Sequence, residues 1–227
     1  MMGKLVVPGL VAIALAAVAQ PAAGQVAGKF QIVPSAGAIE FDDASALKRA
    51  AFLGLDASYF ATRNLAIGLQ LYTSRPVTDG TFFPLTTLDF GDTTYVYAVA
   101  QQVTLVGVGA QVQVQFPLGR LNLFVTGGGG AYRFYLDPRR TQTVERFSGS
   151  SATVGGGVDV AISEYVGVRL EARDLILMDY DRDVFDGTLP YERNTRIPDL
   201  IPAPAAGKDV IHNIRLALGF SFVPGGR

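Results

Sequence analysis

The chain has 227 residues, of which 49% are hydrophobic, with 26 glycines, 12 prolines and no cysteine. The lack of cysteine excludes disulfide frameworks, thiolate metal sites and thiol nucleophiles. The formal net charge of −1 argues against nucleic-acid binding, which normally requires a basic surface.

The first 24 residues have the composition of a cleaved export signal. Lys4 supplies the positive start, residues 5–19 are apolar, and small residues precede Gln25. The apolar part is short for a membrane-spanning helix. We therefore predict a signal peptide over residues 1–24, cleaved between Gly24 and Gln25, and a single mature domain over residues 25–227.

The mature chain contains eight segments in which apolar residues alternate with polar or small ones. The clearest lies before the turn at Pro117–Arg120, where Val106 and Val112 alternate with Gln111 and Gln113. A period of two is the pattern of a β-strand with different surroundings on its two faces. We predict strands over residues 30–39, 50–60, 65–72, 104–116, 121–135, 151–162, 165–177 and 213–222, and residues 95–100 can extend the fourth strand.

The connections between these strands alternate in length. Short turns are predicted near residues 61, 117 and 163, and longer loops near 40, 75, 137 and 178. This arrangement is typical of an up-and-down barrel whose two rims face different compartments, and the strands are long enough to cross a bilayer. The predicted fold class is an all-β, eight-stranded, antiparallel up-and-down transmembrane β-barrel.

The chain resembles the eight-stranded outer-membrane β-barrel superfamily that includes the OmpA transmembrane domain and OmpX. Three segments carry the resemblance: Gly54–Tyr59 (GLDASY), Asn64–Leu69 (NLAIGL) and Val168–Arg173 (VRLEAR). It covers residues 28–222 and includes a last strand that ends in Phe220 and Phe222. The segment Val223–Arg227 departs from the family, whose assembly signal usually ends at the final aromatic residue, and no peptidoglycan-binding domain follows the barrel in this sequence.

Charged residues fall on the face of the strands that is predicted to point inward. The set consists of Asp56, Asp159 and Glu171 with Arg169, Arg173 and Arg215. An eight-stranded barrel is only wide enough for side chains to fill it, so these charges are expected to pair as a plug. The family resemblance implies an alternative, in which these salt bridges switch and so gate a small ion-conducting pore.

The single histidine, His212, lies at the start of the last predicted strand. Its position is similar to that of the histidine in lipid A-modifying barrels, and Asp209, Ser148 and Ser150 are the residues that could complete a catalytic set. No spacing singles them out, so we expect a histidine at the rim without catalytic function.

The longest predicted loop, residues 178–208, is acidic. Asp179, Asp181 and Asp183 begin like a calcium-binding loop, but Val184 and Pro190 stand where an EF-hand requires glycine and glutamate. An EF-hand is therefore excluded. A solvated loop is expected, with divalent-ion bridging to lipopolysaccharide phosphates as the alternative.

We interpret the sequence as an outer-membrane protein with a structural or surface-interaction role and with no enzymatic activity, cofactor or metal site. The alternatives are a membrane-embedded lipid-modifying enzyme, a small pore, and a soluble lipocalin-like carrier, which would invert the observed distribution of apolar and polar faces. The expected partners are outer-membrane lipid and lipopolysaccharide, with the barrel-assembly machinery during insertion. We expect a monomer and no nucleic-acid partner.

Overall fold

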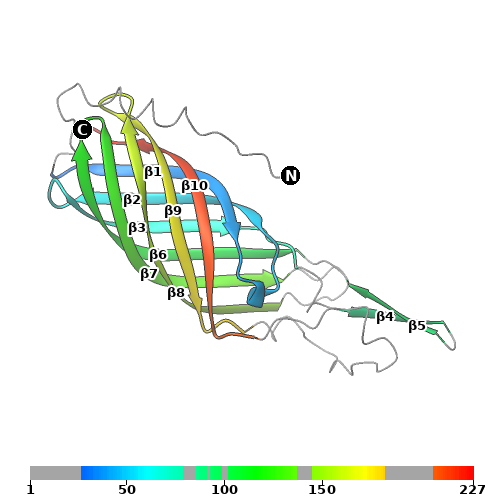
Figure 1. Cartoon of the computed structure of the whole chain (residues 1–227). Coiled ribbons are helices and arrows are strands. Elements are labelled where there is room, and N and C mark those ends of the chain that lie inside the picture. The colour runs from blue at the N-terminus through cyan, green and yellow to red at the C-terminus, as the bar shows by residue number, and fades with distance from the viewer. Residues whose placement is uncertain (1–26, 79–84, 91–92, 99–101, 137–144, 182–206) are drawn as a thin grey trace, which may run out of the picture.

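The computed structural model describes residues 27–78, 85–90, 93–98, 102–136, 145–181 and 207–227. The predicted signal peptide and most of the acidic loop, residues 182–206, lie outside the described residues. Within these ranges the chain forms a β-barrel and a separate β-hairpin (Figure 1). Among the described residues, no helix has the length and apolar character needed to cross a membrane.

Eight strands form the barrel. They are β1 (Phe30–Glu40), β2 (Ala50–Phe60), β3 (Leu65–Ser74), β6 (Val103–Leu118), β7 (Leu121–Leu136), β8 (Glu145–Ala161), β9 (Val166–Met178) and β10 (Val210–Phe222). Every neighbouring pair is antiparallel, and β1 pairs with both β2 and β10, which closes the sheet. The predicted fold class is therefore confirmed.

Strand lengths differ from the prediction mainly at one end of the barrel. Strand β8 begins at Glu145 instead of 151, and β10 begins at Val210 instead of 213. Pairing of β7 with β8 continues as far as Leu136 and Glu145, so the loop predicted from residue 137 to 147 is shorter than expected. The β8 extension is rich in polar residues, which had obscured the alternation there.

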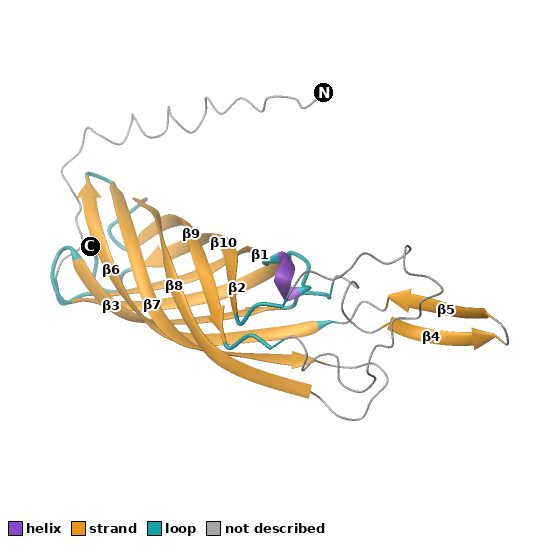
Figure 2. Cartoon of the chain, turned by 60° about the horizontal axis from the view of Figure 1, so that its bottom comes forward, coloured by secondary structure: helices purple, strands orange, loops and turns teal. Residues whose placement is uncertain are grey.

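The connection between β3 and β6 contains a hairpin that the sequence interpretation missed. Strands β4 (Leu85–Phe90) and β5 (Thr93–Ala98) pair with each other in a two-stranded sheet. The interpretation of this region as one long loop was wrong for these residues, and the predicted extension of the fourth strand was wrong over residues 95–98, which belong to β5. Two short β-prone segments flanking Gly91-Asp92 are typical of a hairpin, and Figure 2 shows it beyond the barrel end.

The two faces of the barrel wall have opposite character. Leu69, Val112 and Leu218 are 61, 48 and 51% exposed on the outer face, whereas Gln113 and Arg169 are each 1% exposed inside. The facing predicted from the alternation is therefore confirmed at these positions. Because the outer face is apolar, it matches the hydrocarbon of a bilayer.

The end of the barrel with the short turns carries exposed aromatic residues. Phe30 and Tyr59 pack with ring centroids 5.0 Å apart, and Phe116, Tyr165 and Phe220 are exposed on the same rim. Rings at this position suit the membrane interface, and short turns are typical of the periplasmic side of such barrels. The opposite end, with the long connections, is therefore the extracellular end.

Candidate functional site

Strand β9 places three charged side chains inside the barrel. Arg169, Glu171 and Arg173 occupy alternate positions of the strand, so all three point to the inward face. Arg215 on β10 pairs with Arg173, and Asp56 is contributed by β2 on the other side of β1. Five of the six predicted lumen charges therefore meet in one cluster, which we call the Glu171 cluster.

Glu171 is the centre of this cluster. Its Oε2 lies 3.2 Å from Nε of Arg169 and 2.8 Å from Nη2 of Arg173, and its Oε1 lies 3.2 Å from Nη2 of Arg215. The Nη2 atom of Arg173 also contacts Oδ2 of Asp56. One carboxylate thus binds three guanidinium groups, and the cluster holds three arginines against two carboxylates.

Amide side chains complete the cluster on the opposite wall. Arg173 Nη1 donates to Oε1 of Gln70 (3.1 Å) and of Gln111 (2.7 Å), and Arg169 Nη2 donates to Oε1 of Gln113 (2.8 Å). Hydrogen bonds to charged donors are among the strongest in proteins. The sequence indicated an inward amide face, but it did not indicate that these amides bind the arginines across the lumen.

Inward-facing glycines on β8 give the large side chains their space. A Cβ atom at Gly155 would lie 2.9 Å from Cγ of Arg173, and one at Gly157 would lie 2.8 Å from Cζ of Phe124. The guanidinium carbon of Arg169 lies 3.7 Å from the centroid of the Phe124 ring, a cation–π arrangement. The glycines therefore allow the lumen to be filled by rings and guanidinium groups.

Asp159, the sixth predicted lumen charge, is not part of the Glu171 cluster. Its Oδ1 lies 3.0 Å from Nη2 of Arg227 and accepts from Ser221 Oγ (3.0 Å), and its Oδ2 accepts from Gln31 Nε2 (2.9 Å). The side chains of Asp159 and Arg227 are both 0% exposed. The expected balance of three acids against three bases is therefore split into two separate groups.

Arg227 was missed because it follows the last strand. Gly225 and Gly226 have φ angles of 83° and 77°, which favour glycine, and they reverse the chain after Pro224. The Arg227 amide then donates to the Glu164 carbonyl (2.8 Å), and its side chain enters the periplasmic end of the lumen. The Pro-Gly-Gly sequence before Arg227 is the turn signal that could have indicated this return.

The extracellular half of the lumen is an apolar core. Tyr132, Phe134, Phe147 and Tyr180 form an aromatic cluster in which the Phe134 and Phe147 rings stack with centroids 5.1 Å apart. Around it lie the inward residues Ile39, Phe52, Tyr72, Val103, Leu105, Leu175, Leu177 and Ile211. The sequence interpretation did not predict this core, because it assigned the inward face as a whole to polar residues and glycine.

A short lid covers this core. The 3₁₀ turn η2 (Asp43–Ser45) follows β1, and the Asp42 carboxylate caps it by accepting from the Ala44 amide (2.8 Å). Partial burial acts to raise the pKa of Asp42, but this hydrogen bond and the Lys208 ammonium outweigh it and hold the pKa below its ordinary value. The Tyr180 hydroxyl donates to the Ser45 carbonyl (2.9 Å), which ties the lid to the chain after β9.

Comparison with known proteins agrees with this architecture. Residues 9–192 match the family model described as outer membrane protein beta-barrel domain, which is more than half of the chain. The chain belongs to this family. A search of curated proteins gives no match.

Three solved outer-membrane proteins are similar to this chain at low sequence identity. Neisserial surface protein A is 10% identical, with 85% of this chain and 96% of that chain covered and a TM-score of 0.55. The Ail protein of Yersinia pestis is 12% identical, with 87% and 100% covered and a TM-score of 0.42. The OprG protein of Pseudomonas aeruginosa is 13% identical, with 89% and 99% covered and a TM-score of 0.44.

His212 lies on the outer wall of this outer-membrane barrel. Its Nδ1 is 2.7 Å from Oδ2 of Asp174, and its side chain is 58% exposed. Of the expected catalytic companions, Ser150 donates instead to Asp179 (2.9 Å). In the described part of the chain, His212 has no hydrogen bond to Ser148, Ser150 or Asp209.

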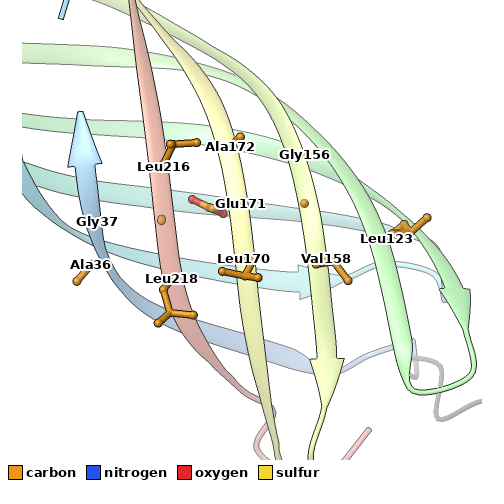
Figure 3. A pocket seen from close by; sticks show the side chains of 12 residues that line it. Ala36, Gly37, Leu123, Gly156, Val158, Leu170, Glu171, Ala172, Leu216 and Leu218 are labelled. Atoms are coloured by element: carbon orange, nitrogen blue, oxygen red, sulfur yellow. The ribbon is translucent and has the colours of Figure 1, made fainter. Parts of the chain in front are cut away.

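The outer wall also carries a shallow hollow of about 580 Å³ over β7 to β10 and β1. Figure 3 shows Leu170 and Leu218 along one side of it, with Gly156 and Ala172 where larger side chains would fill the space. Glu171 borders the hollow but belongs to the inward face. Because the outward side chains are apolar, the hollow is a surface for hydrocarbon and is separate from the charged lumen.

Proposed function

We propose that this outer-membrane protein is a closed barrel that acts as a structural or surface-interaction protein through its extracellular connections and does not conduct. The observation that carries the proposal is the Glu171 cluster, whose side chains are buried and reach from β9 and β10 to β2, β3 and β6. A channel would require these charges to separate.

Two further features support a closed lumen. Above the cluster, the packed side chains of the apolar core and its lid fill the lumen, and dehydrating an ion against apolar side chains is unfavourable. Below the cluster, the Asp159–Arg227 pair occupies the periplasmic end. A pore would therefore have to open at three levels.

We expect planar bilayers containing the full-length folded protein to show little or no steady conductance. The physical reason is that each of the three levels is filled by packed or paired side chains. The measurement is a current recording across a range of voltages, with a porin inserted under the same conditions as a positive control. A stable, ohmic open state in the wild type would contradict the closed-barrel proposal.

A second candidate function, a membrane-embedded lipid-modifying enzyme, has one observation in its favour. His212 uses Nδ1 for the Asp174 carboxylate, which leaves Nε2 available, as in a histidine that acts as a general base. In the described residues no serine contacts this histidine, so the arrangement lacks a nucleophile. We therefore favour the non-enzymatic role.

Replacing His212 with alanine is expected to leave envelope lipid chemistry unchanged, because the pair with Asp174 is not joined to a nucleophile. Lipid A and phospholipid profiles from cells expressing the wild type, the His212→Ala variant and an empty vector provide the measurement. A modification present only with the wild type would favour the enzyme over the structural role.

The remaining proposals concern export and surroundings. We infer that residues 1–24 are removed as a signal peptide near Gly24 and Gln25, that the barrel-assembly machinery inserts the mature domain, and that it functions as a monomer surrounded by outer-membrane lipid and lipopolysaccharide. The apolar outer wall supports the lipid environment.

A further inference from the structure

Three exposed arginines gather on the outer wall at the extracellular end of the barrel. Arg133 on β7 pairs with Ser148 on β8, and Arg146 on β8 pairs with Tyr135 on β7. Arg133 and Arg146 are therefore diagonal neighbours on one face, with Cβ atoms about 7–8 Å apart. Figure 1 shows these strands side by side.

Arg75 lies on the same side of the barrel. It directly follows Ser74, which pairs with Leu105, so it lies beside Thr104 on β6. Thr104 in turn pairs with Tyr135. Arg75 is thus about two strand spacings, roughly 10 Å, from Tyr135. The hydroxyl groups of Thr104 and Tyr135 lie between the arginines.

These arginines stand directly above the apolar belt. On β7 the outward positions from Leu121 to Ala131 are apolar or glycine, and Arg133 is the next outward position. On β3 the outward positions from Leu65 to Leu71 are apolar, and Thr73 separates them from Arg75. Spans of about 9–11 residues cross the hydrocarbon layer, so the guanidinium groups reach the headgroup region of the outer leaflet.

Two other arginine or lysine side chains at this end of the barrel, and the histidine, have carboxylate partners, whereas the exposed Lys48 has none among the described residues. Arg49 lies 3.7 Å from Glu40, Lys208 lies 3.1 Å from Asp42, and His212 pairs with Asp174. Within the described residues, no carboxylate pairs with Arg75, Arg133 or Arg146, and the outward positions of β3, β6, β7 and β8 hold no acidic residue. Among the described residues, the positive charge of these three arginines therefore has no internal counter-charge.

We propose that Arg75, Arg133 and Arg146 form a binding site for the phosphate groups of a phosphorylated lipid in the outer leaflet. Guanidinium groups bind phosphate oxygens with two parallel hydrogen bonds, and two arginines on diagonal positions can share one phosphate. The hydroxyl groups of Thr104 and Tyr135 add donors between them. The lipid chains then lie along the apolar wall below, so that one molecule meets both surfaces.

This site rests on the proposed outer-membrane lipid surroundings, goes beyond the closed-barrel role, and does not depend on whether the lumen conducts. An acidic protein ligand would contact the arginines from the aqueous side, without requiring the adjacent apolar wall. A lipid requires both the phosphate and the membrane-facing position. These two occupants therefore give different results when the phosphate is removed from a lipid probe.

The test compares the full-length folded protein with the double variant Arg133→Gln/Arg146→Gln in detergent. The probes are lipid A, the same glycolipid after enzymatic removal of its phosphates, and inorganic phosphate, with bound lipid counted by native mass spectrometry. We expect the wild type to prefer phosphorylated over dephosphorylated glycolipid by about tenfold or more, as charge-assisted hydrogen bonds imply. Inorganic phosphate is expected to compete only weakly, because it lacks the apolar part.

The matched control is Arg49→Gln, which removes a paired arginine from the same end of the barrel. It is expected to keep the wild-type preference, whereas the double variant loses it. Heat-dependent gel mobility verifies that each variant is folded, and Arg75→Gln provides an independent test if the double variant does not fold. Equal binding of the two glycolipids by the wild type, or an equal loss in Arg49→Gln, would overturn the proposal.

Discussion

Replacing Glu171 with alanine is expected to lower the free energy of unfolding of the barrel in lipid by about 3–5 kcal/mol, the usual result of breaking a buried ion pair. Glu171 is the carboxylate shared by Arg169, Arg173 and Arg215. Without it, Arg173 keeps Asp56, but Arg169 and Arg215 are left without a carboxylate in the cluster. Two buried guanidinium groups then lack a counter-charge.

Because the cluster carries a net charge, removing a carboxylate and removing an arginine are expected to change the stability of the barrel by different amounts. Three arginines and two carboxylates give it a net charge of +1, and Glu171→Ala raises this to +2. Arg215→Met lowers it to zero, so this variant is expected to cost less than Glu171→Ala. The double variant Glu171→Ala/Arg215→Met restores +1 and should recover part of the loss, because one uncompensated charge is gone.

Urea unfolding of the full-length protein in lipid vesicles measures all three variants. Glu40→Ala is the control, since Glu40 and Arg49 form an exposed pair that should contribute less than about 1 kcal/mol. A Glu171→Ala barrel as stable as the wild type would mean that water already compensates the arginines. The lumen would then be hydrated, and the plug proposal would fail.

Much of the barrel wall could be predicted, because the two-residue alternation of a strand can be recognised from neighbouring residues in the sequence. The alternation through Val112 and Gln113 fixes which side chain faces lipid, and the same holds for Arg169 and Leu170 on β9. The strand count followed from the turns between these segments. The hairpin β4–β5 was missed because its two strands are short and lie among residues typical of loops.

The position of an inward side chain along the barrel axis, and its contacts across the lumen, could not be predicted in this way. Alternation gives Asp159 and Glu171 the same facing, yet strand register places Asp159 near the periplasmic end, where it pairs with Arg227. The contact between Asp56 and Arg173 joins residues 117 positions apart and exists only after the barrel closes. The apolar core was missed because inward residues were assigned to a single kind of environment.

Replacing Val112 with arginine is expected to reduce the stability of the barrel in lipid by about 2–4 kcal/mol, the cost of a lipid-facing charge near the bilayer midplane. Val112 lies inside the long strand β6, is 48% exposed, and pairs with Gly127 on β7 and Ile67 on β3. Its outward neighbours are apolar, so the guanidinium group would meet hydrocarbon. Equilibrium unfolding in vesicles is the measurement.

Leu118→Arg is the matched control, because Leu118 has the same facing on the same strand and pairs with Leu121, but it lies at the periplasmic interface, where an added charge costs only about 0–1 kcal/mol. Gln113→Val tests the opposite face: it removes the acceptor of Arg169 and should destabilise the barrel although it adds an apolar side chain. If Val112→Arg were as stable as the wild type while Leu118→Arg was not, the depth assigned to this strand would be wrong. If Gln113→Val stabilised the barrel while Val112→Arg was neutral, its facing would be inverted.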